Sequence, residues 1–392
     1  MTTADAARGR ERRLRLSVFA AGFATFAQVF SVQALLPAIA VDEGTSLSTA
    51  SLALSATTVG MALAVLPWTI YADRHGRLAA VRLALAVATA AALLGPALPE
   101  LWMVLGSRAV LGAALAAVPA AAVTYISEES AASRVTGSIG TFVVGNTLGG
   151  VCGRLVAGLV GDAAGWRVGL GAVGVLGLVA AALFFMAAPG VEGFVRRRIG
   201  VRGVAAAAAT QLRRRGSLPA LAQGFLAMGA FGAMYNYLGV RLVSPDMGVP
   251  RSVASFIFLA YLAGAVSARF SATLVRRYGA RAVVMVGAAA MIAGTFLTCG
   301  PPGAAVGGLV VFTVGCYLVQ PVATAIATMG AAPADRAQAS GLYQLSWLTG
   351  TAAVGSVTGV LYERLGWSAV VGALIAAAAL VAALAMAPTA SR

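Results

Sequence analysis

Long apolar runs, each about the length of a membrane-crossing helix, alternate with short polar connections along the whole chain. Crossing ~30 Å of hydrocarbon at 1.5 Å per residue takes about 20 mainly apolar residues. Twelve stretches reach this length, at residues 17–40, 50–71, 79–98, 101–127, 135–160, 167–188, 217–240, 252–275, 280–299, 303–329, 337–361 and 366–387. The alternating period of a membrane β-barrel is absent from them. The pattern therefore predicts an all-α polytopic membrane protein with twelve transmembrane helices.

Composition agrees with this interpretation, since 60% of the 392 residues are hydrophobic and only 10% are charged. A soluble globular domain carries about 25% charged residues, so a soluble protein of this length is excluded. The net charge is +15, but basic surfaces that bind nucleic acid are hydrophilic as well as basic. We expect surrounding membrane lipid and no nucleic acid. The three cysteines lie in apolar segments without metal-ligand spacing, and we expect no metal, no cofactor and no catalytic residue.

The positive charge is distributed unevenly between the two predicted sides of the membrane. All 28 basic residues are arginines. With the N-terminus inside, 21 of them fall in cytoplasmic segments, four fall on the opposite side, and three lie within predicted spans. An excess of basic residues in cytoplasmic loops sets the orientation of a membrane protein. The distribution predicts that both termini are cytoplasmic.

Landmarks recur at a nearly constant separation along the chain. Gly76 matches Gly279 at an offset of 203 residues, and Gly149 matches Gly350 at an offset of 201. The segment GLVGDAAGW at 158–166 also matches GVLYERLGW at 359–367 at an offset of 201. Parallel repeats are a known way to build a transporter. The sequence predicts two six-helix parallel repeats.

The repeat also predicts the domain organisation. We expect a basic cytoplasmic N-terminus at 1–16, an N-terminal six-helix bundle at 17–189, a basic cytoplasmic linker at 190–216, a C-terminal six-helix bundle at 217–387 and a cytoplasmic tail at 388–392.

Three short motifs carry a resemblance to a known family. The loop between spans two and three reads Asp73-Arg74-His75-Gly76-Arg77, which is similar to the signature D-R-x-G-R. In span four, Arg108 and Gly112 stand at the spacing of R-x-x-x-G. Span five resembles the antiporter motif G-x-x-x-G-P-x-x-G-G through Gly145, Gly149 and Gly153, with Gly150 in place of Pro and Arg154 in place of the last Gly. The chain resembles the major facilitator superfamily, and within it the bacterial drug/proton antiporters and sugar-efflux-like permeases.

The resemblance implies the major facilitator fold, a monomer, and a location in the bacterial cytoplasmic (inner) membrane. In the family the loop motif stabilises the outward-open state. We expect Asp73 to act as the carboxylate of a cytoplasmic gate, with Arg77 and Glu128 as partners and Arg74 and Gly76 as the other motif positions. The alternative is that these residues lie at the lipid headgroups and only fix the topology. Arg276 stands where the second half would carry the acid, so the gate is expected in one half only.

Charge within the spans is informative because an intramembrane ionisable residue is costly and usually functional. All 13 Asp and Glu residues fall in loops or at helix ends, so no mid-membrane proton carrier is evident. Arg108 and Arg154 lie inside spans four and five, where they could face an aqueous cavity and attract an anionic or polar substrate. The alternative is that each snorkels or bonds to backbone carbonyls.

Uncharged polar residues supply the rest of a predicted cavity. Tyr317, Gln320 and Thr324 recur at i, i+3 and i+7 on one face of span ten. Gln28 in span one and Asn146 in span five lie at similar depth. Such a lining suits neutral or amphipathic organic solutes, although the same groups could serve as hydrogen bonds between helices.

The motif glycines have a separate predicted role. Gly112, Gly145, Gly149 and Gly153 are expected to let helices pack closely, those of span five at the interface between the two halves.

Together these features predict a secondary active transporter that works by alternating access, and not an enzyme. The resemblance implies efflux of a small-molecule substrate in exchange for protons. A core without carboxylates also allows a facilitator or an uptake permease without proton coupling. The sequence has no G-x-x-x-x-G-K-[ST] motif for nucleotide hydrolysis. A non-transporting membrane sensor remains an alternative; a lipid-modifying intramembrane enzyme is disfavoured because the spans lack a His/Asp/Glu cluster.

Overall fold

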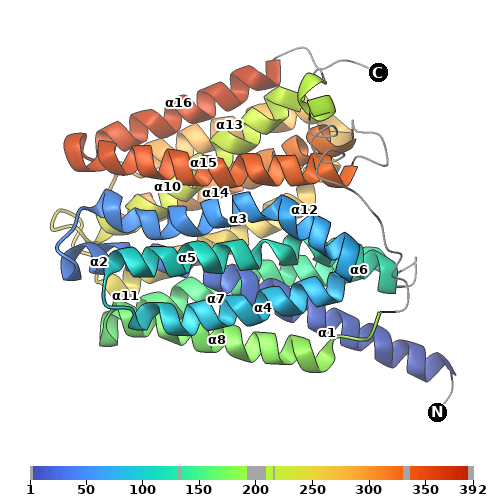
Figure 1. The fold of residues 1–392 in the computed structure, drawn as a ribbon. Helices are drawn as coiled ribbons and strands as arrows, with labels where there is room; N and C mark the ends of the chain where they lie inside the picture. The colour runs from blue at the N-terminus through green and yellow to red at the C-terminus, as the bar shows by residue number, and fades with distance from the viewer. Residues whose placement is uncertain (1–2, 131–133, 192–208, 215–216, 330–335, 387–392) are drawn as a thin grey trace. The chain divides into compact units, whose positions relative to one another are not determined.

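A computed structural model describes residues 3–130, 134–191, 209–214, 217–329 and 336–386. Most of the expected linker at 190–216 and the whole expected tail at 388–392 lie outside these residues. Within the described residues the regular elements are helices, with no strand (Figure 1). This agrees with the predicted all-α fold.

Eleven described segments are long and apolar enough to cross a membrane. They are Arg8–Asp42, Leu47–His75, Arg77–Ala97, Leu101–Glu129, Gly137–Ala164, Trp166–Ala187, Ser217–Val243, Arg251–Tyr278, Ala280–Leu297, Pro302–Thr328 and Trp367–Met386. The span expected at 337–361 corresponds to α15 (Arg336–Leu365), which is more polar. Its 30 residues are nevertheless long enough to cross, at ~45 Å for a rise of 1.5 Å per residue.

The chain divides into two compact units. Unit 1 contains Met1–Ala38 and Ala56–Val201, and unit 2 contains Ile39–Ser55 and Arg202–Arg392. The helix α3 (Leu47–His75) therefore begins in unit 2 and continues in unit 1.

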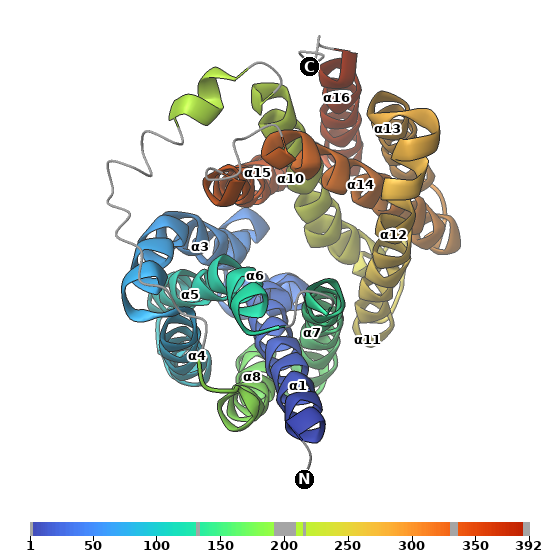
Figure 2. The same cartoon turned by 90° about the vertical axis from the view of Figure 1, so that its right-hand side faces the viewer.

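Unit 1 is arranged around its first helix. Besides most of α3 it contains α1 (Thr3–Phe30), η1 (Ser31–Leu35), the start of α2 (Leu36–Asp42), α4 (Arg77–Leu94), η2 (Gly95–Ala97), α5 (Leu101–Leu115), α6 (Ala117–Glu129), α7 (Val135–Ala164) and α8 (Trp166–Ala187). The helix α1 packs against α7 and α8, and α4 packs against α5, α6 and α8 (Figure 2). The basic stretch at 1–16 is not separate from the first span, because α1 already begins at Thr3.

Unit 2 is also helical throughout its described elements, and it includes the end of α2 and the start of α3. It contains α10 (Ser217–Val243), α11 (Arg251–Ala254), η3 (Ser255–Leu259), α12 (Ala260–Tyr278), α13 (Ala280–Leu297), α14 (Pro302–Met329), α15 and α16 (Trp367–Met386). The helix α10 packs against α14, α15 and α16, as α1 packs against α7 and α8 in unit 1.

The backbone confirms the parallel repeat. Gly76 and Gly279 link consecutive helices at φ values of 100° and 85°, and Gly165 and Gly366 do so at 91° and 75°. Side chains other than glycine rarely adopt this region.

A second matched pair lies within helices. A Cβ on Gly149 would lie 2.3 Å from the Phe23 carbonyl oxygen, and one on Gly350 would lie 2.2 Å from that of Phe225. Glycine at these positions allows α7 to approach α1, and α15 to approach α10, at backbone contact distance.

Candidate functional site

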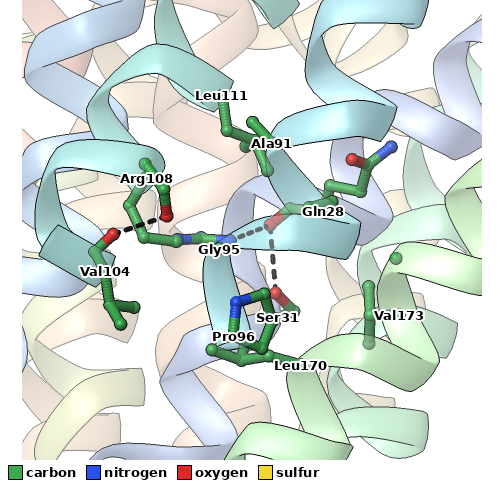
Figure 3. A pocket seen from close by; sticks show the side chains of 13 residues that line it. Gln28, Ser31, Ala91, Gly95, Pro96, Val104, Arg108, Leu111, Leu170 and Val173 are labelled. Atoms are coloured by element: carbon green, nitrogen blue, oxygen red, sulfur yellow. Dashed lines mark hydrogen bonds between the residues drawn. The ribbon is translucent and has the colours of Figure 1, made fainter. Parts of the chain in front are cut away.

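The candidate site of unit 1 lies at a break in the first span, where α1 ends at Phe30 and the tighter helix η1 begins. Such a change of helix type leaves backbone carbonyls without their intrahelical donors. Arg108 of α5 donates from Nη1 to the Gln28 carbonyl oxygen at 3.0 Å (Figure 3). It also donates from Nη2 to the Val29 carbonyl oxygen at 2.7 Å. The guanidinium therefore satisfies the carbonyls at the end of α1.

A narrow pocket runs alongside this contact and has room for about one water molecule. Arg108, Gln28 and Ser31 line it (Figure 3). Ser107 also lines it. Arg108 Nε and Gln28 Oε1 are buried and make no hydrogen bond to the described residues. One donor and one acceptor complement a single water, and the space is too small for an organic solute.

Arg154 of α7 approaches the same break and is fully buried. It donates from Nε to Gln33 Oε1 at 2.8 Å and from Nη1 to the Gly150 carbonyl oxygen at 2.6 Å. Its guanidinium lies 4.7 Å from the ring centroid of Phe30. Gly150 and Arg154 are the two substitutions in the antiporter motif of span five, so the structure brings both departures into one contact.

Both candidate substrate-binding arginines are thus held by the region where α1 breaks. This geometry is the one described by the alternative interpretation, in which intramembrane arginines bond to backbone carbonyls. A direct role of either arginine in binding solute stays a prediction.

The motif glycines of span five face α1 at regular intervals. Cβ atoms on Gly145, Gly149 and Gly153 would lie 2.3, 2.3 and 2.2 Å from carbonyl oxygens of α1. We expected these glycines to lie at the interface between the two halves. In the structure their face of α7 packs instead against α1, a helix of the same unit. Gly112 of α5 has the same function toward α3, since its Cβ would lie 1.9 Å from the Thr57 carbonyl oxygen.

Asn146 lies on this same face of α7. A Cβ added to Gly22 of α1 would lie 2.2 Å from Asn146 Oδ1. This oxygen is buried and makes no hydrogen bond within the described part of the chain. Asn146 is therefore directed into the α1–α7 contact.

The expected gate residues form a cluster where α3 ends and α4 begins. Arg77 donates from Nη2 to Asp73 Oδ1 at 2.6 Å, and its Nε lies 3.4 Å from Glu128 Oε1 of α6. Asp73 and Arg77 are buried, while Arg74 is exposed and lies outside the cluster. Gly76 supplies the turn that places Arg77 back against Asp73. The structure thus brings Asp73, Arg77 and Glu128 together; their role as a gate stays a prediction.

Sequence analysis missed a second ionic cluster nearby. Glu11 is 9% exposed and accepts from Arg15 Nε at 3.2 Å and from Ser138 Oγ at 2.8 Å. Arg10 forms an ion pair with Glu129. The arginines near the N-terminus therefore bind α6 and α7 as well as setting charge balance. The i,i+4 spacing of Glu11 and Arg15 was the available signal.

In unit 2, the three predicted cavity residues lie on one half-buried face of α14. The Gln320 carbonyl oxygen accepts from Thr324 Oγ1 at 2.7 Å and from Tyr343 Oη at 3.2 Å. Pro321 follows inside the helix and lacks an N–H, which removes the hydrogen bond to the Tyr317 carbonyl. The side-chain amide of Gln320 makes no hydrogen bond to the described residues, so its donors and acceptor remain available.

Tyr317 also belongs to an aromatic cluster from three helices. Its ring centroid lies 5.6 Å from that of Phe231, which lies 4.9 Å from that of Tyr261. Tyr235 joins at 4.7 Å from Tyr261 and shares a hydrogen bond of 2.8 Å with Thr313. Sequence analysis did not group these residues, because they meet only through packing of α10, α12 and α14.

Comparison with known proteins agrees with the fold. The family model described as the Major Facilitator Superfamily matches residues 18–331 and 243–391. The inner membrane transport protein YnfM of Escherichia coli (strain K12) is 32% identical over 367 residues, covering 93% of this chain and 87% of that protein. The uncharacterized MFS-type transporter YybF of Bacillus subtilis (strain 168) is 29% identical over 362 residues, covering 92% and 89%.

Solved structures share the architecture at low sequence identity. An inward-facing, occupied bacterial homolog of the human lysosomal transporter Spinster has a TM-score of 0.75 at 14% identity, covering 96% of this chain and 95% of that one. A mutant of the nucleoside transporter NupG has a TM-score of 0.74 at 16% identity, covering 95% and 98%. The relatives are named as transporters and not as enzymes. This multi-pass membrane chain is accordingly a transporter that belongs to the Major Facilitator Superfamily.

Proposed function

We propose that this transporter exports a small neutral or amphipathic organic solute by alternating access, in exchange for protons. The observation that carries the proposal is the half-buried face of α14. There, Gln320, whose side-chain amide makes no hydrogen bond to the described residues, shares a helix face with Tyr317 and Thr324. A few polar groups beside aromatic rings suit a solute that is partly polar and partly apolar.

The arginines of unit 1 support an uncharged solute. Nη1 and Nη2 of Arg108 each donate to a backbone carbonyl, and Arg154 is fully buried against Gln33 and Gly150. An anionic solute would have to displace these contacts before it could pair with either guanidinium.

The proposed orientation places both termini in the cytoplasm of a bacterial cell, with the chain in the inner membrane. The arginine distribution supports it, with 21 residues on that side against four on the other. The cluster of Asp73, Arg77 and Glu128 then lies at the cytoplasmic end of unit 1, in the place of a gate.

Coupling to protons needs a group that titrates. Within the described residues, Asp73 is a buried carboxylate at the end of α3, and Glu11 is one within the first third of α1. They are the candidates for proton exchange in this proposal. The second candidate function, facilitated diffusion or uptake without protons, is favoured by a different observation: no Asp or Glu lies near the middle of a predicted span.

Purified protein in proteoliposomes tests the proposal. Solutes that raise the thermal stability of the protein in a binding screen are offered outside vesicles with an acidic lumen. Antiport predicts that protons leaving the lumen drive solute inward, and that a protonophore abolishes the difference from vesicles without a gradient. Equal uptake with and without the gradient would support the facilitator, and no uptake of any binding solute would refute both.

A variant pair connects the test to the site. Gln320→Ala is expected to lower uptake at least tenfold, because the amide contacts the solute. Thr328→Val is the matched control on the same helix, since within the described residues the Thr328 hydroxyl bonds only to the Thr324 carbonyl, at 2.8 Å. Equal uptake by the two variants would remove Gln320 from the proposed site.

A further inference from the structure

An arginine lies over a tryptophan at one end of unit 2. Arg241, near the end of α10, has its guanidinium 5.3 Å from the ring centroid of Trp367, the first residue of α16. Its Nη2 donates to the Cys299 carbonyl oxygen, just beyond the end of α13, at 3.2 Å. Tyr362 of α15 packs edge-to-face against Trp367, with ring centroids 6.3 Å apart. We call this contact of four helices the Trp367 corner, and all of it belongs to unit 2.

Two donors in the Trp367 corner have no acceptor. Arg241 Nε and Trp367 Nε1 are buried and make no hydrogen bond to the described residues. Burying an N–H without an acceptor is costly, and the charge of a guanidinium also needs compensation. Asp246 and Arg241 both act electrostatically on the Tyr362 hydroxyl, yet within the described part of the chain they form no ion pair. An anionic acceptor would therefore satisfy both the hydrogen bonding and the charge.

The matching corner of unit 1 has its acceptors in the chain itself. Trp166 lies 201 residues before Trp367, and the guanidinium of Arg167 lies 4.4 Å from the Trp166 ring centroid. Arg167 donates to three carbonyl oxygens of the segment between α4 and α5, those of Pro96, Leu98 and Pro99. Among the described residues, neither Trp166 nor Arg167 has a buried side-chain nitrogen without a partner. Backbone carbonyls thus complete this corner.

Unit 2 repeats the arrangement with fewer acceptors. Pro96 lies 203 residues before Cys299, an offset also found between the glycine turns, so the two arginines bond to matching carbonyls. Arg241 reaches its carbonyl from α10, because Ser368 stands in unit 2 where Arg167 stands in unit 1. Its bond to Cys299 is its one hydrogen bond within the described residues. The acceptors that unit 1 takes from its backbone have to come, in unit 2, from a bound molecule.

The surroundings of the Trp367 corner are those of a lipid headgroup. The helices α10 and α13 are long and apolar enough to cross a membrane and end at this corner, and α16, which is also long enough, begins there. Tryptophan is enriched at the level where a bilayer meets water. Next to the corner along the chain, exposed apolar side chains are present at Phe296, Leu297 and Leu365. A phospholipid offers a phosphodiester for the guanidinium, ester carbonyls for the indole and acyl chains for these side chains.

We propose that the Trp367 corner binds the headgroup of a membrane phospholipid. A phosphodiester oxygen accepts from Arg241 Nε, and an ester carbonyl oxygen accepts from Trp367 Nε1. Arg241 is half-buried and its bond to Cys299 lies at the surface, so a movement of this side chain admits the headgroup. Basic pockets between membrane helices bind headgroups in this way, and a guanidinium bonds more strongly to an anionic oxygen than to a neutral one. The proposal is independent of the direction of transport and of proton coupling.

The indole N–H signal of Trp367 in an NMR spectrum tests the site directly. The chain contains five tryptophans, and isotope-labelled tryptophan in the full-length protein in detergent gives an indole signal for each. Trp367→Phe assigns the signal of the proposed site, and Trp166→Phe assigns that of the matched tryptophan in unit 1. The protein is titrated with three probes: a short-chain phosphatidylglycerol, a diacylglycerol with the same chains, and inorganic phosphate.

Phosphatidylglycerol should move the Trp367 indole proton downfield in a saturable manner and leave that of Trp166 in place. Diacylglycerol and inorganic phosphate should move neither signal. Arg241→Gln should raise the apparent Kd for phosphatidylglycerol about tenfold, as expected for loss of a charge-assisted hydrogen bond. Arg364→Gln is the matched control, because it removes an exposed arginine near Trp367 in the chain, and it should change this Kd less than about twofold.

A Trp367 signal that does not respond to phosphatidylglycerol would overturn the proposal. An equal response to diacylglycerol would do so as well, by identifying an apolar contact, and an equal response to inorganic phosphate would identify a site for a free anion instead. An unchanged Kd in Arg241→Gln would remove the guanidinium from the site. If that variant does not fold, the titration of the unaltered protein with the three probes still decides between these outcomes.

Discussion

Arg154 in unit 1 and Gly355 in unit 2 hold matching positions in the repeat, each five residues after a glycine that contacts the first helix of its unit. In unit 1 the guanidinium bonds to Gln33 and lies against Phe30, where α1 is broken. In unit 2 the corresponding helix α10 continues unbroken from Ser217 to Val243, and the Gly355 carbonyl accepts from Tyr237 Oη at 2.8 Å. The break and the buried cation thus occur together in unit 1, and at the matching positions of unit 2 the helix is continuous and a glycine stands in place of the arginine.

Replacement of Arg154 is expected to have the largest effect on stability. Arg154→Leu removes the guanidinium donor of Gln33 Oε1 and the second donor of the Gly150 carbonyl, which should cost about 3 kcal/mol of unfolding free energy. Gly355→Ala should cost less than about 1 kcal/mol, because the new Cβ would meet only Asn236 Nδ2 at 3.4 Å. Thermal unfolding in detergent compares the two variants. Equal losses of unfolding free energy would contradict the expectation that unit 1 depends more on Arg154 than unit 2 depends on Gly355.

The glycine contacts should respond alike in the two units. Gly149→Ala and Gly350→Ala each place a Cβ against a backbone carbonyl, at 2.3 and 2.2 Å, and should each cost about 2 kcal/mol through overpacking. The same unfolding assay measures both. A large loss of unfolding free energy in only one variant would show that different contacts stabilise the matching helix pairs of the two units.

Arg108→Lys should act on the break itself with a smaller loss, about 1 kcal/mol, because a single ammonium cannot reproduce the two-pronged bond to Gln28 and Val29. Hydrogen exchange of the backbone amides at 31–35 should accelerate, since η1 loses its anchor. Arg269→Lys is the control, because Arg269 is an exposed arginine within a span of unit 2. Unchanged exchange at 31–35 would separate Arg108 from the break.

The smallest effect on stability is expected at Gln320, whose side chain bonds to no described residue. Gln320→Ala should change the unfolding free energy by less than about 0.5 kcal/mol, although we expect it to abolish most transport. A destabilisation as large as that of Arg108→Lys would identify the amide as a contact between helices. This measurement distinguishes the polar group of unit 2 from the charged ones of unit 1.

The sequence was sufficient for features that depend on local pattern. Span length depends on a run of apolar residues, and Gly76, Gly165, Gly279 and Gly366 lie at turns that require a positive φ. The pairing of Asp73 with Arg77 is also local, because the two residues are four apart and Gly76 turns the chain between them. Each of these features is determined within a few residues.

Features that depend on helix packing could not be derived in this way. Nothing in span four indicates that Arg108 will reach the carbonyls of α1, because the two lie about 80 residues apart. The contact of the span-five glycines with α1 and the aromatic cluster around Phe231 also arise from helix packing, so local sequence pattern does not indicate them. For the break after Phe30 one signal was available: Pro37, which lacks the N–H that a continuous helix would use.

The broken first helix also constrains the order in which the protein is assembled. When span one enters the bilayer during synthesis, the Gln28 carbonyl can accept from the Ser31 hydroxyl at 3.0 Å, but both it and the Val29 carbonyl lack the Arg108 donor until span four arrives. Arg154 enters with span five and, facing lipid alone, would cost about 2.5–3.5 kcal/mol on insertion scales. Spans one, four and five should therefore leave the insertion machinery as one associated group. Biogenesis of the first half is then cooperative over roughly 150 residues, while the second half, which has no matching buried charges at these positions, can insert its helices one at a time.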